Sequence, residues 1–90
     1  MSERKLCFIT IVGPDKKGIV AQVSQELYES SMNIVDISMK TMEDYFVGSI
    51  LIDRNDSFIS KEKLREQMNE FGKSMNLKVY VDCQEDFKAQ

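Results

Sequence analysis

The stretch LCFITIVGPDKKGIVAQVSQEL, residues 6–27, contains a change of periodicity that decides the fold. Its first seven residues are almost all apolar and rich in β-branched side chains, which predicts a strand covered on both faces. The breaker GPDKKG follows at residues 13–18. Beyond it, apolar residues recur at spacings of three and four, which predicts an amphipathic helix. The residues of this apolar stripe are Ile19, Val20, Val23 and Leu27.

The rest of the chain continues to alternate between strand and helix patterns. Residues 34–42 have a period of two and predict a half-buried strand, which forms a hairpin with a strand predicted over residues 45–53. Ser60 is the predicted N-cap of a second helix, because an apolar stripe at helical spacing follows it. That stripe consists of Leu64, Met68, Phe71 and Met75. Residues 77–83 predict the last strand, and residues 84–90 predict a flexible tail.

The predicted order is β-α-β-β-α-β, the ferredoxin-like arrangement of an α+β domain. In that fold a four-stranded antiparallel sheet carries both helices on one face, and we expect one such domain over residues 1–90. The first and third strands are apolar on both faces, so the face without helices would expose an apolar patch. This patch predicts a homo-oligomer, most simply a dimer with two-fold symmetry.

The composition favours binding or regulation over catalysis. The chain has 90 residues, a net charge of −3 and no histidine, and its pI is about 4.9. The acidic balance argues against direct nucleic-acid binding. The missing histidine removes the commonest general base and a favoured metal ligand, so we predict no enzyme, no catalytic residues, no metal and no cofactor. No apolar run is long enough to span a membrane, and the cytoplasm is the expected location.

Two cysteines, Cys7 and Cys83, fall in the first and last predicted strands. The ferredoxin-like order places these strands side by side and antiparallel, so the two residues are expected to be cross-strand neighbours. They form no metal-binding spacing. In a reducing cytoplasm we expect two free thiols.

The loop at residues 13–18 is the strongest candidate for a binding site. It has the two glycines of a phosphate-binding loop, but Ile19 and Val20 replace the required Lys and Ser or Thr, so a nucleotide site is excluded. Free main-chain N–H groups at a helix start attract carboxylates, and Gly18 allows a close approach. Asp15 either caps the helix or accepts a bond from a ligand's ammonium group.

Residues 12–24 together with NIVDI at residues 33–37 resemble the signature of the ACT domain family. The likeness is greatest to small stand-alone ACT proteins similar to the glycine cleavage system transcriptional repressor. The resemblance implies a regulatory module that binds amino acids and pairs side by side, with ligands between subunits. The implied ligand-binding residues are Gly13, Asp15, Gly18, Ile19, Asn33 and Asp36.

These observations predict a regulatory module that binds a small molecule, expected to be an amino acid, acts as a homodimer and modulates a partner protein. The alternative is a ligand-independent interaction module that pairs with another ACT-containing protein. Acylphosphatases share the fold but need an arginine in the first loop, which this loop lacks. RNA-recognition domains share the strand order, but their basic Gly-aromatic motif is missing here.

Overall fold

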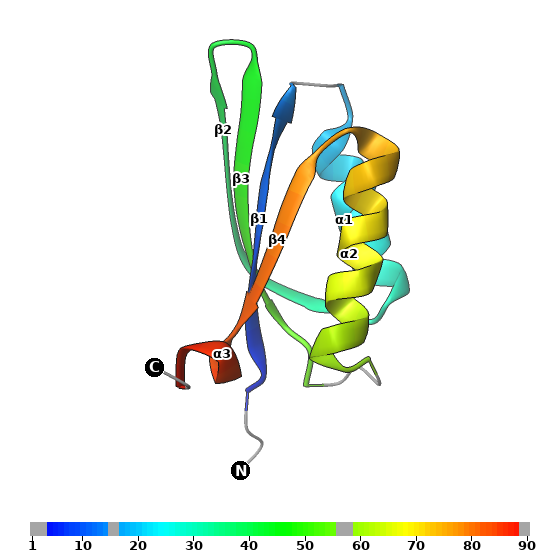
Figure 1. Ribbon diagram of the computed structural model, residues 1–90, viewed down its shortest axis with the longest axis vertical. Helices are drawn as coiled ribbons and strands as arrows, with labels where there is room; N and C mark the ends of the chain where they lie inside the picture. Colours follow the sequence, from blue (N-terminus) through cyan, green and yellow to red (C-terminus); the bar gives the residue numbers. More distant parts are fainter. Residues whose placement is uncertain (1–3, 15–16, 56–58, 89–90) are drawn as a thin grey trace.

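The computed structural model describes residues 4–14, 17–55 and 59–88. One antiparallel sheet with the strand order β2-β3-β1-β4 forms one layer, and α1 and α2 cover the same side of it (Figure 1). This is the predicted ferredoxin-like fold. Its elements in chain order are β1 (Leu6–Pro14), α1 (Ile19–Glu29), β2 (Asn33–Met42), β3 (Tyr45–Asp53), α2 (Lys61–Met75), β4 (Lys78–Cys83) and α3 (Gln84–Lys88).

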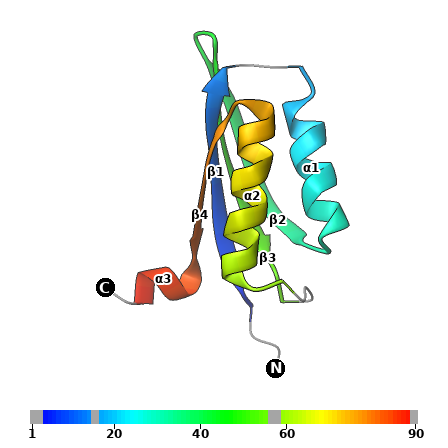
Figure 2. The ribbon, with the colours of Figure 1, turned by 45° about the vertical axis from the view of Figure 1, so that its right-hand side comes forward.

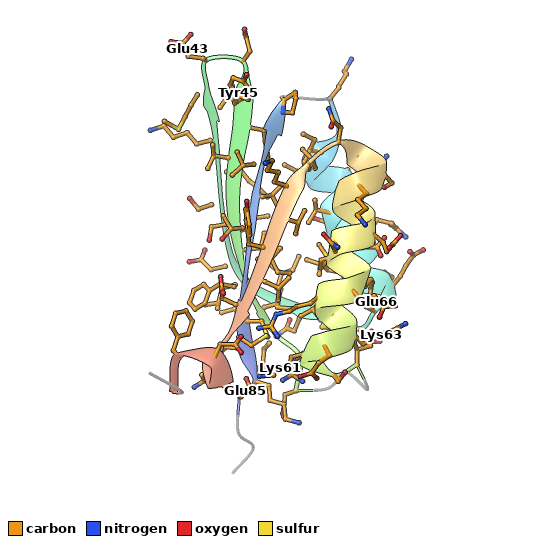
Figure 3. The ribbon with its side chains drawn as sticks, viewed as in Figure 1. Glu43, Tyr45, Lys61, Lys63, Glu66 and Glu85 are labelled. Carbon is orange, nitrogen blue, oxygen red and sulfur yellow. A yellow bond between two sulfur atoms is a disulfide. The ribbon has the colours of Figure 1, made fainter. Side chains whose placement is uncertain are left out.

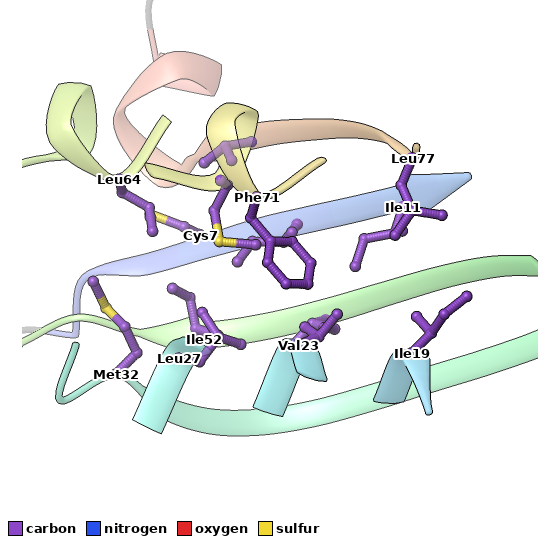
Figure 4. Close-up of a cluster of buried hydrophobic side chains, with 14 of the residues drawn as sticks. Cys7, Ile11, Ile19, Val23, Leu27, Met32, Ile52, Leu64, Phe71 and Leu77 are labelled. Atoms are coloured by element: carbon purple, nitrogen blue, oxygen red, sulfur yellow. The ribbon is translucent and has the colours of Figure 1, made fainter. Parts of the chain in front are cut away.

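The core lies between the sheet and the two long helices (Figure 4). In β1, alternate side chains point to the helices, and Cys7, Ile9 and Ile11 are fully buried. Each large apolar side chain buried in this way contributes roughly 1.5–3 kcal/mol through its removal from water. The helices pack against these strand residues with buried members of the predicted stripes. These are Ile19, Val23 and Leu27 of α1 and Leu64, Met68 and Phe71 of α2.

Local signals in the sequence set the ends of α2. The hydroxyl oxygen of Ser60 accepts a hydrogen bond from the N–H of Lys63 at 3.2 Å, so Ser60 is the N-cap as predicted. At the other end Asn76 adopts a left-handed conformation with φ of 58°, and the N–H of Leu77 donates to the carbonyl of Gly72. This left-handed cap ends the helix and turns the chain into β4.

The prediction that β2 is half-buried is wrong. Most of its residues are exposed, including Val35 and Ile37, and only Ile34 and Met39 are partly buried against the core. The reason is the strand order, because β2 is an edge strand beyond the main helix cover. Val20 of α1, predicted to lie in the buried stripe, is likewise 44% exposed.

The cysteines are cross-strand neighbours as predicted, but the expectation of two thiols is contradicted, since Cys7 and Cys83 form a disulfide. The register places them directly opposite each other in β1 and β4, and both side chains are fully buried on the helix face. The sequence pattern did not predict that both cysteine side chains would be fully buried. The bond joins residues that are 76 positions apart in the sequence.

A short helix, α3, occupies most of the segment for which the sequence predicts a flexible tail. Asp86 accepts a hydrogen bond from the N–H of Cys83 at 2.7 Å, which reproduces half of a capping box with Cys83 as N-cap. The rings of Phe87 and Phe8 meet edge to face, with centroids 6.4 Å apart. Since Phe8 lies on the face without helices, α3 is on the opposite side of the sheet from α1 and α2 (Figure 2).

Candidate functional site

The end of β1 is closely packed at Gly13, where a larger residue would require neighbouring atoms to shift. A Cβ atom on Gly13 would lie 2.6 Å from Leu77 Cδ2 and 3.1 Å from the carbonyl oxygen of Asn76. Gly13 is buried, so it serves the packing of β1 against the turn between α2 and β4. Any contact that Gly13 makes with a ligand would involve its main chain.

Gly18 is required at the start of α1 for a different reason. Its φ of 83° lies in the left-handed region, whereas a Cβ atom there would meet nothing within 4 Å. The main chain, rather than crowding, therefore selects glycine.

The N-terminus of α1 has no side-chain cap and no acidic residue in its first turn among the described residues. The first main-chain bond of the helix runs from the N–H of Gln22 to the carbonyl of Gly18 at 3.0 Å. The N–H groups of the first turn have no helical carbonyl to bind and carry a partial positive charge, which suits a carboxylate. Ile19 joins this site only through its N–H, because its side chain is buried in the core.

The predicted residues of β2 lie at the other end of the sheet. Gly13 is paired with Phe46, but Asn33 is paired with Asp53. These two partners are seven positions apart in β3, which corresponds to about 24 Å along an antiparallel strand. Asp36, opposite Leu51, is also remote from the loop. One copy of the chain therefore does not bring Asn33 and Asp36 to Gly18. Asp15 lies outside the described residues.

Asp36 is exposed and follows an irregularity in the pairing of β2 with β3 at Val35. Its Oδ1 atom accepts the N–H of Ile37 at 2.8 Å. One carboxylate oxygen is thus used within the strand, while Oδ2 is left at the surface.

Asp53, the partner of Asn33, holds the main chain at that end of the sheet. The N–H group of Lys5 donates to its carboxylate at 3.0 Å and lowers its pKa most. The N–H of Asn55, also at 3.0 Å, and the Arg4 guanidinium at 3.6 Å lower the pKa further. Because its oxygens are engaged in this way, Asp53 serves structure. Asn33 and Asp36 are the polar groups in the first four residues of β2.

The sequence analysis missed an apolar surface along the β2 edge. Gln67 of α2 donates to Glu26 at 2.9 Å, which marks the flank of α1 that faces α2. At 100° per residue, Val20 and Tyr28 lie toward the opposite flank, on the side of β2. We call the exposed residues Val20, Tyr28, Val35 and Ile37 the edge patch. Sequence periodicity gave no signal for it, since apolar residues at these spacings also fit a buried face.

Within residues 4–14, 17–55 and 59–88, no group of three or more Cys, Asp or Glu residues is placed to hold a metal ion. In the same part of the chain, no helix has the length and apolar character needed to cross a bilayer.

The element order and the four-stranded antiparallel sheet define a small ferredoxin-like α+β domain. The family model of the ACT domain matches residues 5–82, and the chain belongs to the ACT domain family. A UPF0237 protein of Clostridium acetobutylicum is 36% identical over 81 residues, which cover 90% of this chain and 91% of the relative. A UPF0237 protein of Methanopyrus kandleri is 35% identical, with 90% of each chain covered.

Solved structures agree with this assignment. An ACT domain protein from Streptococcus pneumoniae has a TM-score of 0.85 and 33% identity, and the match covers 98% of this chain and 99% of that one. A putative glycine cleavage system transcriptional repressor has a TM-score of 0.78 at 21% identity, covering 92% of this chain and 47% of that protein. The latter likeness concerns the fold alone.

Proposed function

We propose that this chain is a regulatory module that binds a small molecule, an amino acid, between the two subunits of a homodimer and thereby modulates a partner protein. Membership of the ACT domain family, whose members are generally regulatory and bind small molecules, supports the first part. The observation that carries the rest is the exposed, apolar edge of β2, beside a helix start with open N–H groups.

A two-fold axis at the β2 edge, perpendicular to the sheet, would place the β2 strands of two copies side by side and antiparallel. The eight-stranded sheet would keep all long helices on one face, and the edge patch would be covered. An antiparallel arrangement reverses the ends of the second copy. The start of β2 in one copy, with Asn33, is then brought toward the α1 start of the other, with Gly18.

This arrangement accounts for the distance between the predicted site residues within one chain. The N–H groups at the start of α1 would bind the carboxylate of the amino acid. Asn33 and the free Oδ2 atom of Asp36 from the second copy would accept hydrogen bonds from its ammonium group. Such a site is complete only in the dimer, which gives the ligand control over assembly.

The second candidate is an interaction module that needs no ligand. It is supported by the same β2 edge, which offers unpaired main-chain groups to a strand of another ACT-containing protein. The two functions differ in one measurable respect, namely whether a free amino acid binds.

The first test is calorimetry of the purified protein against the twenty amino acids. We expect one amino acid, or a small group of them, to bind with a stoichiometry of one ligand per subunit. Silence across the whole panel would contradict the ligand proposal and favour the interaction module.

The second test asks whether the site spans two subunits. Gly18→Asn adds a side chain above the helix start while tolerating the left-handed conformation, and Asn33→Ala removes the amide of the second copy. Each variant alone should lose most of its binding. After unfolding and refolding as an equal mixture, about a quarter of the sites should recover, because each mixed two-fold dimer has one unaltered site. No recovery in a mixture that forms mixed dimers would show that the site lies within one chain.

A further inference from the structure

A pocket of about 560 Å³ lies at the end of the sheet, between the last residues of β1, the start of β3 and the turn from α2 to β4. Its volume is within the usual range for small-molecule sites. The apolar side chains of its lining are those of Val12, Pro14, Tyr45 and Leu77, and two lysines contribute charge, Lys73 and Lys78. The rest of the lining is Gly13, Gly72 and Asn76. Of the described residues assigned to the proposed intersubunit site, only Gly13 also lines this pocket.

The pocket arises from the unequal lengths of two strands. The pairing of β4 with β1 ends at Lys78, opposite Val12, whereas β1 continues to Pro14 beside β3. The chain enters β4 through the left-handed turn at Asn76, which leaves the flank of the last β1 residues uncovered by a strand.

The walls of this pocket are firmly held. Leu77 is buried, and its N–H donates to the carbonyl of Gly72 at 2.8 Å. A Cβ atom on Gly72 would lie 2.8 Å from the carbonyl oxygen of Leu77, so the turn fits closely against the end of α2. The pocket is therefore preformed, which lowers the ordering cost of binding.

The charge of the lining has one sign. Lys73 and Lys78 both contribute, and none of the described residues that line the pocket carries a carboxylate. Among the described residues, neither ammonium group has an Asp or Glu oxygen within 4.0 Å, whereas Lys61 and Lys63 are both paired. Two unneutralised cations above an apolar floor favour an anion with an apolar body.

We propose that this pocket binds a small organic carboxylate that has an aromatic or branched apolar body and no ammonium group. The carboxylate would lie between Lys73 and Lys78, and the apolar body would pack against Tyr45, Val12 and Leu77. An amino acid is disfavoured here, because its ammonium group would face two lysines at short range. This inference goes beyond the proposed function, and it adds a second ligand class to each subunit.

The test uses three fluorinated probes of nearly equal shape, each followed by fluorine NMR during titration with the protein. They are para-fluorophenylpropanoate, its primary amide and para-fluorophenylalanine. We expect the carboxylate to bind most tightly and the other two at least about threefold more weakly, as suits charge pairs at partly exposed positions. Equal affinities for all three probes would overturn the proposal.

Two double variants locate the effect. Lys73→Gln with Lys78→Gln should weaken binding of the carboxylate probe by about fivefold and leave the amide unchanged. Lys5→Gln with Lys63→Gln makes the same change of net charge at the opposite end of the molecule, where Lys63 lies far from Tyr45 (Figure 3). This control should bind like the wild type. An equal loss in both double variants would show general electrostatic attraction, and no loss in either would exclude the pocket.

The apolar contact is checked separately with Tyr45→Ser, since Tyr45 is exposed and its removal leaves the core intact. We expect weaker binding of both the carboxylate and the amide probes. Unchanged binding of both would place the apolar body elsewhere and overturn the proposal. The amino-acid panel described above does not depend on these outcomes, so either proposal can fail alone.

Discussion

The two edges of the sheet differ sharply in how they are protected. On the β4 edge, Arg65 Nε donates to the carbonyl of Val81 at 3.1 Å, and the same guanidinium pairs with Asp86 of α3. The disulfide fixes Cys83, the end of this edge, to β1. On the β2 edge, the hydrogen bond between Asp36 and Ile37 is the only one from a side chain to the main chain of β2 among the described residues.

This difference indicates which edge is open to association. Exposed edge strands invite pairing with another chain, and proteins block those that must remain single. Here the blocked edge has charged partners and a helix that follows it, whereas the open edge has Val35 and Ile37 at the surface. If two copies pair as proposed, β2 is therefore the edge that we expect to meet the second copy.

The largest expected effect comes from breaking the covalent bond on the blocked edge. Reduction of the disulfide should lower the free energy of unfolding by about 4 kcal/mol, because the bond closes a long loop and restricts the unfolded chain. Urea unfolding with and without reductant measures this. The double variant Cys7→Ala with Cys83→Ala is the control and should not respond to reductant. Two titratable thiols in the untreated protein, with no effect of reductant, would contradict the prediction.

The contrast between the edges also shows what the sequence determines. The apolar stripe of Leu64, Met68 and Phe71 predicted α2, because residues at these spacings share one face of a helix but not one face of a strand. In contrast, the period of two in residues 34–42 fits a central strand or an edge strand equally well, so the exposure of Ile37 could not be predicted. Strand order decides that exposure, and it depends on contacts distant in sequence.

The site was predictable only in part for a related reason. The loop pattern identified Gly18 as a candidate site residue. The structure shows that glycine is needed there for its left-handed φ, and not to leave room for a ligand. The separation of Asn33 from that loop depends on the β2–β3 register, which a local motif does not contain. The pocket beside Lys73 and Lys78 arises from a difference in strand length and has no sequence signal.

A smaller effect is expected from a charge on the open edge. Ile37→Lys should weaken self-association by roughly a hundredfold, because two lysines related by the two-fold axis would be desolvated close together. Sedimentation equilibrium measures the change in mass. Tyr80→Lys is the matched control, since Tyr80 is a similarly exposed apolar residue on β4 and its variant should remain dimeric. Dissociation caused by Tyr80→Lys but not by Ile37→Lys would assign the interface to the other face or edge.

The smallest effect concerns Asp86, which links α3 to the blocked edge. The N–H of Cys83 lowers its pKa most, and Lys61 and Arg65 add to this shift below the ordinary value of 3.8. The ionised carboxylate therefore favours folding, and its contribution is complete above pH 3.8 and is lost as the pH falls through the lower pKa of the folded state. Urea unfolding from pH 7 to pH 2 should show Asp86→Asn less stable than the wild type at neutral pH and nearly equal to it at the acid end. Asp82→Asn makes the same charge change on an exposed residue of β4 without an ion pair among the described residues, and it should parallel the wild type throughout. A constant difference between Asp86→Asn and wild type across the whole pH range would show that Asp86 stabilises α3 by shape rather than by charge.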